Sequence, residues 1–119
     1  MHELALAESI VDMVAEHAES RRVRRITVEI GTLACVMPDA LRFCFGLAST
    51  GTVLESARLE IVEVKATARC RACGDTFFQD TFWTACPCGE SDFERLTGEE
   101  LSVREYELHT DAVAWQRCD

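Results

Sequence analysis

Two closely spaced pairs of cysteines constrain the fold of this chain more than any other feature. The run CRACG contains Cys70 and Cys73, and the run CPCG contains Cys86 and Cys88. Two cysteines in one tight turn can place both sulfurs about 2.3 Å from one ion, and a following glycine accepts the backbone conformation of that turn. The pattern predicts a closed tetrahedral site of four thiolates, which is typical of structural zinc.

The second pair departs from a regular zinc knuckle, because only Pro87 separates its cysteines. Less backbone is then available to direct both sulfurs at one ion, so a three-thiolate site with another fourth ligand is an alternative. The candidates for that ligand are Asp80, Glu90, a histidine, Cys118 or water. Iron in a rubredoxin-like electron carrier is a further alternative, since four thiolates accept either metal. A redox dithiol is less favoured, because it needs only one pair.

The remaining cysteines indicate a reducing compartment. They are Cys35, Cys44 and Cys118, which are scattered, and the total of seven is odd. A secreted disulfide framework is usually even and spread along the chain. We therefore expect a cytoplasmic protein with reduced cysteines, and no stretch of the sequence predicts a membrane span or a signal peptide. Because Cys35 and Cys44 have apolar neighbours, we expect both to pack in the core.

The hydrophobic pattern predicts an α+β fold in which two helices pack on a small mixed β-sheet, with an inserted zinc-ribbon-like domain. The predicted helices span 4–18 and 40–48, and the predicted strands span 26–30, 59–64 and 101–108. The segment around the four cysteines has too few aliphatic residues for a core of its own. We therefore divide the chain into a discontinuous domain, 1–66 and 100–119, and an insertion, 67–99.

The charge of the chain limits its partners. It has 12 Lys and Arg against 21 Asp and Glu, a formal net charge of −9. A nucleic-acid-binding surface is basic, so nucleic acid is excluded, and cations or basic protein surfaces are favoured. Because no nucleophile and base are suitably spaced, we do not expect an enzyme.

The N-terminus offers a set of nitrogen ligands. The amine of Met1, the backbone nitrogens of residues 2 and 3, and the imidazole of His2 are linked by short chelate rings. Such sets favour planar Ni(II) or Cu(II). The alternative is that His2 is a surface residue on a frayed first turn. His17 and His109 have no neighbours at ligand spacing, so we expect both to lie at the surface.

Taken in order, these motifs resemble the HypA/HybF family of hydrogenase maturation nickel chaperones, essentially from end to end. The resemblance rests on MHEL at 1–4, Cys35-Val36, LRFCF at 41–45, the two cysteine pairs and GEEL at 98–101. It implies a nickel-binding α/β domain with an inserted zinc domain. In that family His2 would be the essential nickel ligand, aided by the Met1 amine and main-chain nitrogens, with Glu3 tuning or contacting the site.

The same resemblance implies that Cys70, Cys73, Cys86 and Cys88 hold structural Zn(II). It also implies that the chain passes Ni(II), together with a GTPase partner, to the large-subunit precursor of [NiFe] hydrogenase; some members also serve urease.

The sequence departs from the family pattern in two places. One departure is that Ala85 falls where the family has a cysteine when Cys88 is aligned. A second is that this chain has no histidine between His17 and His109. In family members whose zinc cysteines are flanked by histidines, a pH-responsive exchange of zinc ligands is plausible. Without such histidines, this behaviour is not expected here.

The competing hypothesis is a zinc-ribbon adaptor that uses no nickel and docks a basic partner through its acidic surface. The motifs do not choose between a monomer and a homodimer, or between a hydrogenase and urease as the client enzyme. They also leave open whether Glu3 is a nickel ligand, a neighbour of a ligand, or a charge that complements the helix dipole.

Overall fold

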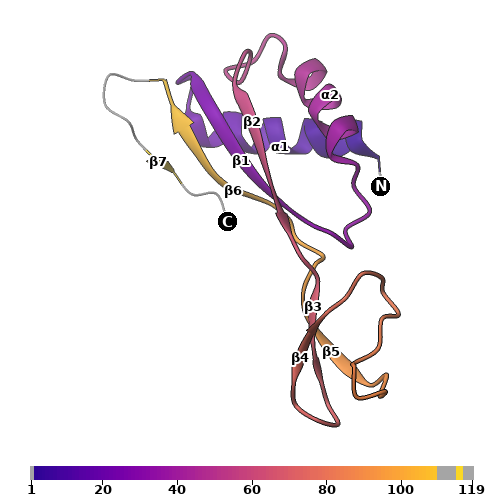
Figure 1. Ribbon diagram of the computed structural model, residues 1–119. Helices are drawn as coiled ribbons and strands as arrows, with labels where there is room; N and C mark the ends of the chain where they lie inside the picture. The colour runs from indigo at the N-terminus through magenta and orange to yellow at the C-terminus, as the bar shows by residue number, and fades with distance from the viewer. Residues whose placement is uncertain (1, 110–114, 117–119) are drawn as a thin grey trace. The chain divides into compact units, whose positions relative to one another are not determined.

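The computed structural model describes residues 2–109 and 115–116 (Figure 1). The helices are α1 (Glu3–Ala18) and α2 (Pro38–Ser49). The strands are β1 (Val23–Gly31), β2 (Arg58–Val64), β3 (Thr67–Cys70), β4 (Thr76–Phe78), β5 (Phe93–Thr97), β6 (Leu101–Leu108) and β7 (Trp115–Gln116). Each of the five elements predicted from the sequence is present, with both ends within three residues of the prediction. The predicted α+β class is confirmed.

The chain divides into two compact units. The first comprises Met1–Val28, Val36–Val62 and Ser102–Asp119, and the second comprises Glu29–Cys35 and Glu63–Leu101. The insertion proposed from the sequence, 67–99, falls within the second unit, which also includes the end of β1 and the turn after it. Within the described residues, no helix is long and apolar enough to cross a membrane.

The helices of the first unit begin and end for local reasons. α1 starts directly after His2, whose carbonyl accepts the first helical hydrogen bond from the Leu6 amide at 3.1 Å. α2 starts at Pro38, where the fixed φ of proline suits the first helical position. The two helices pack against each other. The buried apolar residues of this unit include Ala7, Ile10, Val11, Val14, Ala18, Ile26, Leu41, Phe45 and Tyr106.

The larger sheet has the strand order β2-β1-β6-β7. The His109 amide donates to the Arg22 carbonyl and the Gly31 amide to the Glu100 carbonyl, both at 2.8 Å, so β1 and β6 run antiparallel. On the side of β1 that faces β2, the Val23 amide donates to the Val53 carbonyl and the Thr32 amide donates to the Val64 carbonyl. The residue numbers of donors and acceptors thus increase together. β1 and β2 are therefore parallel, with α2 in the crossover that parallel strands require. The sheet is mixed, as predicted.

The second unit contains a three-stranded antiparallel sheet of order β4-β3-β5. Its buried cluster consists of Ala68, Cys70, Phe77 and Cys86, with half-buried Phe93 packed against it. The rings of Phe77 and Phe93 meet edge to face, with centroids 5.9 Å apart. No leucine, isoleucine or valine belongs to this cluster, which agrees with the expectation of too small a core.

The prediction that Cys35 and Cys44 are core residues was wrong. Cys35 is exposed and Cys44 is only half-buried. Cys35 lies where the chain turns between β1 and α2, and its φ of 60° is in the left-handed region. A side chain at such a turn lies outside the alternation of the preceding strand, so apolar neighbours in the sequence do not predict its burial.

A close approach of backbones in the second unit requires glycine at position 98. The Leu33 amide donates to the Gly98 carbonyl at 2.8 Å, and Gly98 has a φ of 118°. A Cβ on Gly98 would overlap the Cβ of Ala66 and lie 2.6 Å from its Cα. Both the conformation and the space therefore exclude a side chain here.

We predict that Gly98→Ala lowers the free energy of unfolding by about 2 to 4 kcal/mol, from backbone strain and overpacking. Gly46→Ala is the matched control, because Gly46 lies inside α2 with nothing within 4 Å of an added Cβ. It should raise stability by up to about 1 kcal/mol through helix propensity. Denaturant unfolding measures both changes, and a Gly98→Ala protein as stable as the parent would contradict the prediction.

Candidate metal centre

Four cysteine sulfurs converge in the second unit. Those of Cys70, Cys73, Cys86 and Cys88 all lie within 4.8 Å of one another. Across the two pairs, Cys70 Sγ lies 3.7 Å from Cys88 Sγ, and Cys73 Sγ lies 3.6 Å from Cys86 Sγ. Sulfurs bound tetrahedrally at about 2.3 Å from a zinc ion would lie about 3.8 Å apart. The four side chains therefore fit the donor type and the spacing of a Zn(II) site.

The first cysteine turn directs both of its sulfurs inward through backbone hydrogen bonds. The Cys73 amide donates to Cys70 Sγ at 3.5 Å, and the Gly74 amide donates to the Cys70 carbonyl at 2.9 Å. The φ of Gly74 is 82°, which only glycine adopts without strain. The Cys70 amide in turn donates to the Asp75 carbonyl at 2.9 Å.

The second turn makes the same contacts with one residue fewer. The Cys88 amide donates to Cys86 Sγ at 3.5 Å, and the Gly89 amide donates to the Cys86 carbonyl at 2.8 Å. Gly89 has a φ of 98°, and the Glu90 carbonyl accepts from the Cys86 amide at 3.1 Å. Removing a residue therefore tightens the turn but keeps both sulfurs directed at the cluster.

The electrostatics of the cluster favour a bound cation. The pKa of the Cys70 thiol falls to about 7, chiefly because the Cys73 amide donates to its sulfur. The Cys88 amide acts in the same direction on Cys86, but burial and the neighbouring thiols outweigh it and raise the pKa of Cys86 to about 12. Four thiolates so close together repel one another, so full ionisation requires a positive ion among them.

The cluster is closed and lies at the edge of a small core. Cys70 and Cys86 are buried, with 1% and 5% of their surface exposed, whereas Cys73 and Cys88 are exposed. Among the described residues, this quartet is the one group of histidines, cysteines and carboxylates placed to hold a metal ion. Asp80 and Glu90, the proposed alternative ligands, are exposed. Cys118 lies outside the described residues.

The predicted N-terminal site residues lie at the start of α1. His2 is exposed and is the N-cap residue of the helix, with no capping hydrogen bond from its side chain. Glu3 is half-buried, and its Oε2 accepts a hydrogen bond from the Met37 amide at 3.2 Å. That bond is the main reason the pKa of the Glu3 carboxyl is lowered. Met1 lies outside the described residues, and His17 and His109 are exposed, as expected.

Sequence reasoning missed Met37, which fixes Glu3 from the other helix. Met37 is the N-cap residue of α2, directly before Pro38. The helix predicted over 40–48 placed a helix start close to Met37, but a backbone donor carries no signal of its partner. Only the packing of the two helices brings Glu3 and Met37 together.

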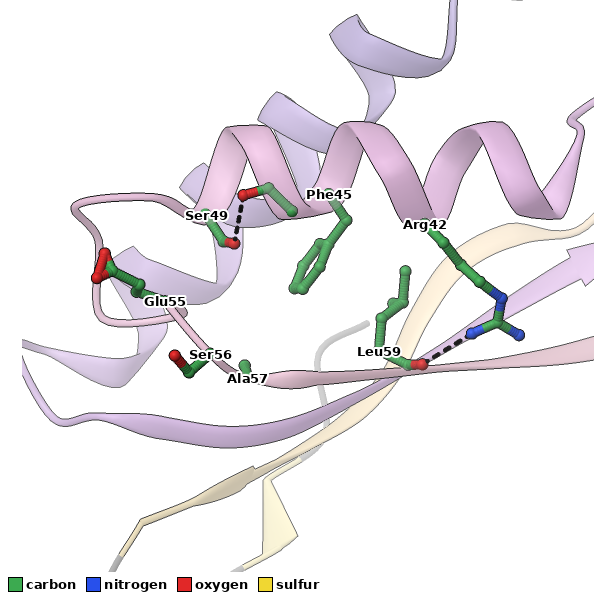
Figure 2. A pocket seen from close by; sticks show the side chains of 8 residues that line it. Arg42, Phe45, Ser49, Glu55, Ser56, Ala57 and Leu59 are labelled. Carbon is green, nitrogen blue, oxygen red and sulfur yellow. Dashed lines mark hydrogen bonds between the residues drawn. The ribbon is translucent and has the colours of Figure 1, made fainter.

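A shallow pocket lies between α2 and the segment that leads into β2 (Figure 2). It has a volume of about 490 Å³, and Arg42 and Glu55 are its ionisable residues. The Arg42 guanidinium donates to the Leu59 carbonyl at 3.1 Å, and the Ser49 hydroxyl donates to the Gly46 carbonyl at 3.3 Å. The Arg42 side chain thus links α2 to β2, whereas the Ser49 bond lies within α2.

A small unit that carries four converging thiols, in a chain that also contains a mixed α+β unit, defines a protein with a metal-binding site. A family model described as hydrogenase/urease nickel incorporation, metallochaperone, HypA, matches residues 1–108. The chain therefore belongs to the HypA family, and the resemblance seen in its motifs is confirmed.

Individual relatives agree with this assignment. The hydrogenase maturation factor HypA of Nostoc punctiforme is 45% identical over 108 residues, covering 91% of this chain and 96% of the relative. That of Trichormus variabilis is 45% identical over 113 residues, covering 95% and 100%. The fold matches the solution structure of the nickel metallochaperone HypA from Helicobacter pylori with a TM-score of 0.66 at 22% identity, covering 91% of this chain and 97% of that one.

We predict that the purified chain contains one zinc per molecule and that Cys86→Ala reduces it well below one. Cys86 is the sharpest position to test, because the shortened turn puts its role in question. Cys35→Ala is the matched control, since Cys35 is exposed and outside the cluster. Elemental analysis measures the outcome. A full zinc content in Cys86→Ala would contradict the four-thiolate site, and a red protein with one iron per chain would contradict zinc.

Proposed function

We propose that this chain is a nickel metallochaperone that binds one Ni(II) at its N-terminus and delivers it during the maturation of [NiFe] hydrogenase. The observation that carries the proposal is the match over residues 1–108 to a family described by nickel incorporation, in a chain whose second residue is an exposed histidine. Its role is then to bind and transfer a metal ion, not to catalyse a chemical reaction.

The start of α1 suits a removable nickel ion. The first helical amide to donate within α1 is that of Leu6, so the amides of His2 and Glu3 make no helical hydrogen bond. Nickel could use these nitrogens together with the His2 imidazole and the Met1 amine without breaking the helix. Ligands at an exposed chain end are easily displaced, which favours transfer over storage.

Glu3 is best assigned as a positioning residue. Its Oε2 accepts from the Met37 amide, so the carboxylate is used in attaching the first turn of α1 to the start of α2. This bond limits the motion of the residue next to His2 and lowers the cost of ordering the ligands when nickel binds. The carboxylate also lies in the first helical turn, where negative charge is favourable.

Zinc at Cys70, Cys73, Cys86 and Cys88 would have a structural role. The four thiolates would complete its coordination, which leaves no position for a substrate. When bound, zinc supplies the folding free energy that the small cluster of Ala68 and Phe77 lacks. Such a site needs reduced sulfurs, which fits a cytoplasmic location.

We assign two partners to this function on the strength of family membership. A GTPase maturation partner would take part in nickel delivery, and the large-subunit precursor of [NiFe] hydrogenase would receive the ion. The relatives in Nostoc punctiforme and Trichormus variabilis are both named for hydrogenase maturation, which favours a hydrogenase over urease as the client.

We predict that His2→Ala abolishes stoichiometric nickel binding and leaves the zinc content unchanged, because the imidazole is the one side-chain nitrogen in the proposed set. An extension placed before Met1 should have the same effect by removing the free amine. His17→Ala is the control, as His17 is an exposed histidine of the same helix. Isothermal titration of the untagged protein with Ni(II) measures all three. Unchanged affinity in His2→Ala would favour the zinc-ribbon adaptor.

We predict that Glu3→Gln keeps near-parental nickel affinity, whereas Glu3→Ala weakens it severalfold. Glutamine retains an oxygen that can accept from the Met37 amide, and alanine does not. If Glu3 instead bound nickel through its charged carboxylate, both variants would lose affinity to a similar degree. The same titration with Ni(II) separates the two roles.

A further inference from the structure

The second cysteine turn is attached to its surroundings by one arginine on each side. It is the shorter of the two turns, with Pro87 alone between its cysteines. Arg95 of β5 contacts the loop that leads into this turn, and Arg71 of the first turn contacts the segment that follows it. Both arginines belong to the second unit and lie outside the set of four cysteines.

Arg95 fixes the loop before the second turn. Its Nε donates to Gln79 Oε1 at 3.1 Å and its Nη2 donates to the Phe82 carbonyl at 3.0 Å. The guanidinium also lies over the Phe82 ring, with Cζ 4.9 Å from the centroid. Buried Gln79 in turn donates through Nε2 to the Thr84 carbonyl at 3.0 Å. The chain therefore reaches Cys86, two residues after Thr84, from a loop held by four contacts.

Arg71 fixes the segment after the second turn. Its Nη1 donates to Asp92 Oδ1 and to the Phe93 carbonyl, both at 2.8 Å. One guanidinium nitrogen carries two N–H groups, so it can make both bonds. The Arg71 amide also donates to the Asp92 carbonyl at 3.0 Å. Because Arg71 lies between Cys70 and Cys73, these bonds attach the end of the second turn to the first turn itself.

The orientation of one turn relative to the other decides which metal ion the four sulfurs accept. Around a tetrahedral ion, two pairs of sulfurs define planes that cross at right angles, whereas in a planar complex the two planes coincide. Zinc is tetrahedral in such sites, and Ni(II) favours planar geometry. A planar nickel complex would therefore require the second turn to rotate against the first, and the contacts of Arg71 and Arg95 oppose that rotation.

We propose that Arg71 and Arg95 are positioning residues that keep the four-cysteine site selective for zinc over Ni(II). The inference rests on the proposed function, in which one chain handles nickel while zinc stays bound. Thiolates bind both ions, so selectivity must come from geometry and not from the donor atoms. By fixing the second turn on both sides, the two arginines retain zinc and exclude the nickel ion that the chain carries.

The test uses the full chain with His2→Ala, which removes the proposed N-terminal nickel site. Arg71→Ala deletes one set of contacts, and Arg95→Met deletes the other while keeping an apolar stem beside Phe82. Arg69→Ala is the matched control, because Arg69 is an exposed arginine two residues before Arg71 and takes part in none of these contacts.

Each zinc-loaded protein is titrated with Ni(II), and two quantities are followed. Elemental analysis gives the zinc that is displaced, and the charge-transfer absorption between thiolate and Ni(II) reports nickel bound by the cysteines. Zinc affinity is measured separately by competition with a chelator. The ratio of nickel to zinc affinity is the decisive readout, because a residue that only stabilises the unit would change both affinities by the same factor.

We expect Arg71→Ala and Arg95→Met each to raise this ratio at least about fivefold, as a change of residues that support metal ligands does. Arg69→Ala should keep the parental ratio, and the starting protein should show no nickel–thiolate absorption. A parental ratio in both variants, an equal rise in Arg69→Ala, or nickel–thiolate absorption in the starting protein would overturn the inference.

Two further results keep the test decisive. If Arg95→Met does not fold, Asp92→Ala replaces it, since the Asp92 side chain is 72% exposed and accepts from Arg71. A parental ratio in both Asp92→Ala and Arg71→Ala would then overturn the inference. Zinc missing from the starting protein would overturn the proposed zinc site, and with it this inference, whereas a failure of nickel binding at His2 would overturn only the proposed nickel site.

Discussion

The second unit depends on the convergence of four cysteine sulfurs. The buried cluster around the metal centre consists of Ala68, Cys70, Phe77 and Cys86, so two of its four residues are themselves cysteines of the centre. So little apolar surface is buried that hydrophobic burial offsets only a small part of the entropy lost by three short strands. The metal centre and the core are therefore one structure here, and a change that weakens one weakens the other.

The two cysteine turns reach the same result from unequal lengths. In both, a sulfur accepts from the amide of the second cysteine, and a glycine with positive φ closes the turn on the first cysteine's carbonyl. What the cluster requires is this set of contacts and not a fixed number of residues between the cysteines. The one residue by which the second turn is shorter than the first is accommodated within the turn.

The sequence predicted the elements whose signal is local. α1, α2 and β1 were found because their apolar residues repeat at helical or strand spacing, and β2 and β6 were found as runs rich in β-forming residues. β3, β4 and β5 were missed as separate strands, because segments of three to five residues are too short to display a period. The convergence of all four cysteines followed from their spacing. The exposure of Cys35 and the partner of Glu3 could not be predicted from the sequence. The first is decided by a turn of the backbone, and the second by packing between residues distant in the sequence.

The hydrogen bond from Met37 to Glu3 joins residues that are 34 positions apart in the sequence. During synthesis, the first turn of α1 leaves the ribosome well before α2 exists to hold it. The carboxylate beside His2 thus acquires its partner only after the whole β1 strand and the start of α2 have been made and have folded back. A nascent chain presents the same histidine without this support, so the N-terminal arrangement distinguishes the finished protein from the growing one.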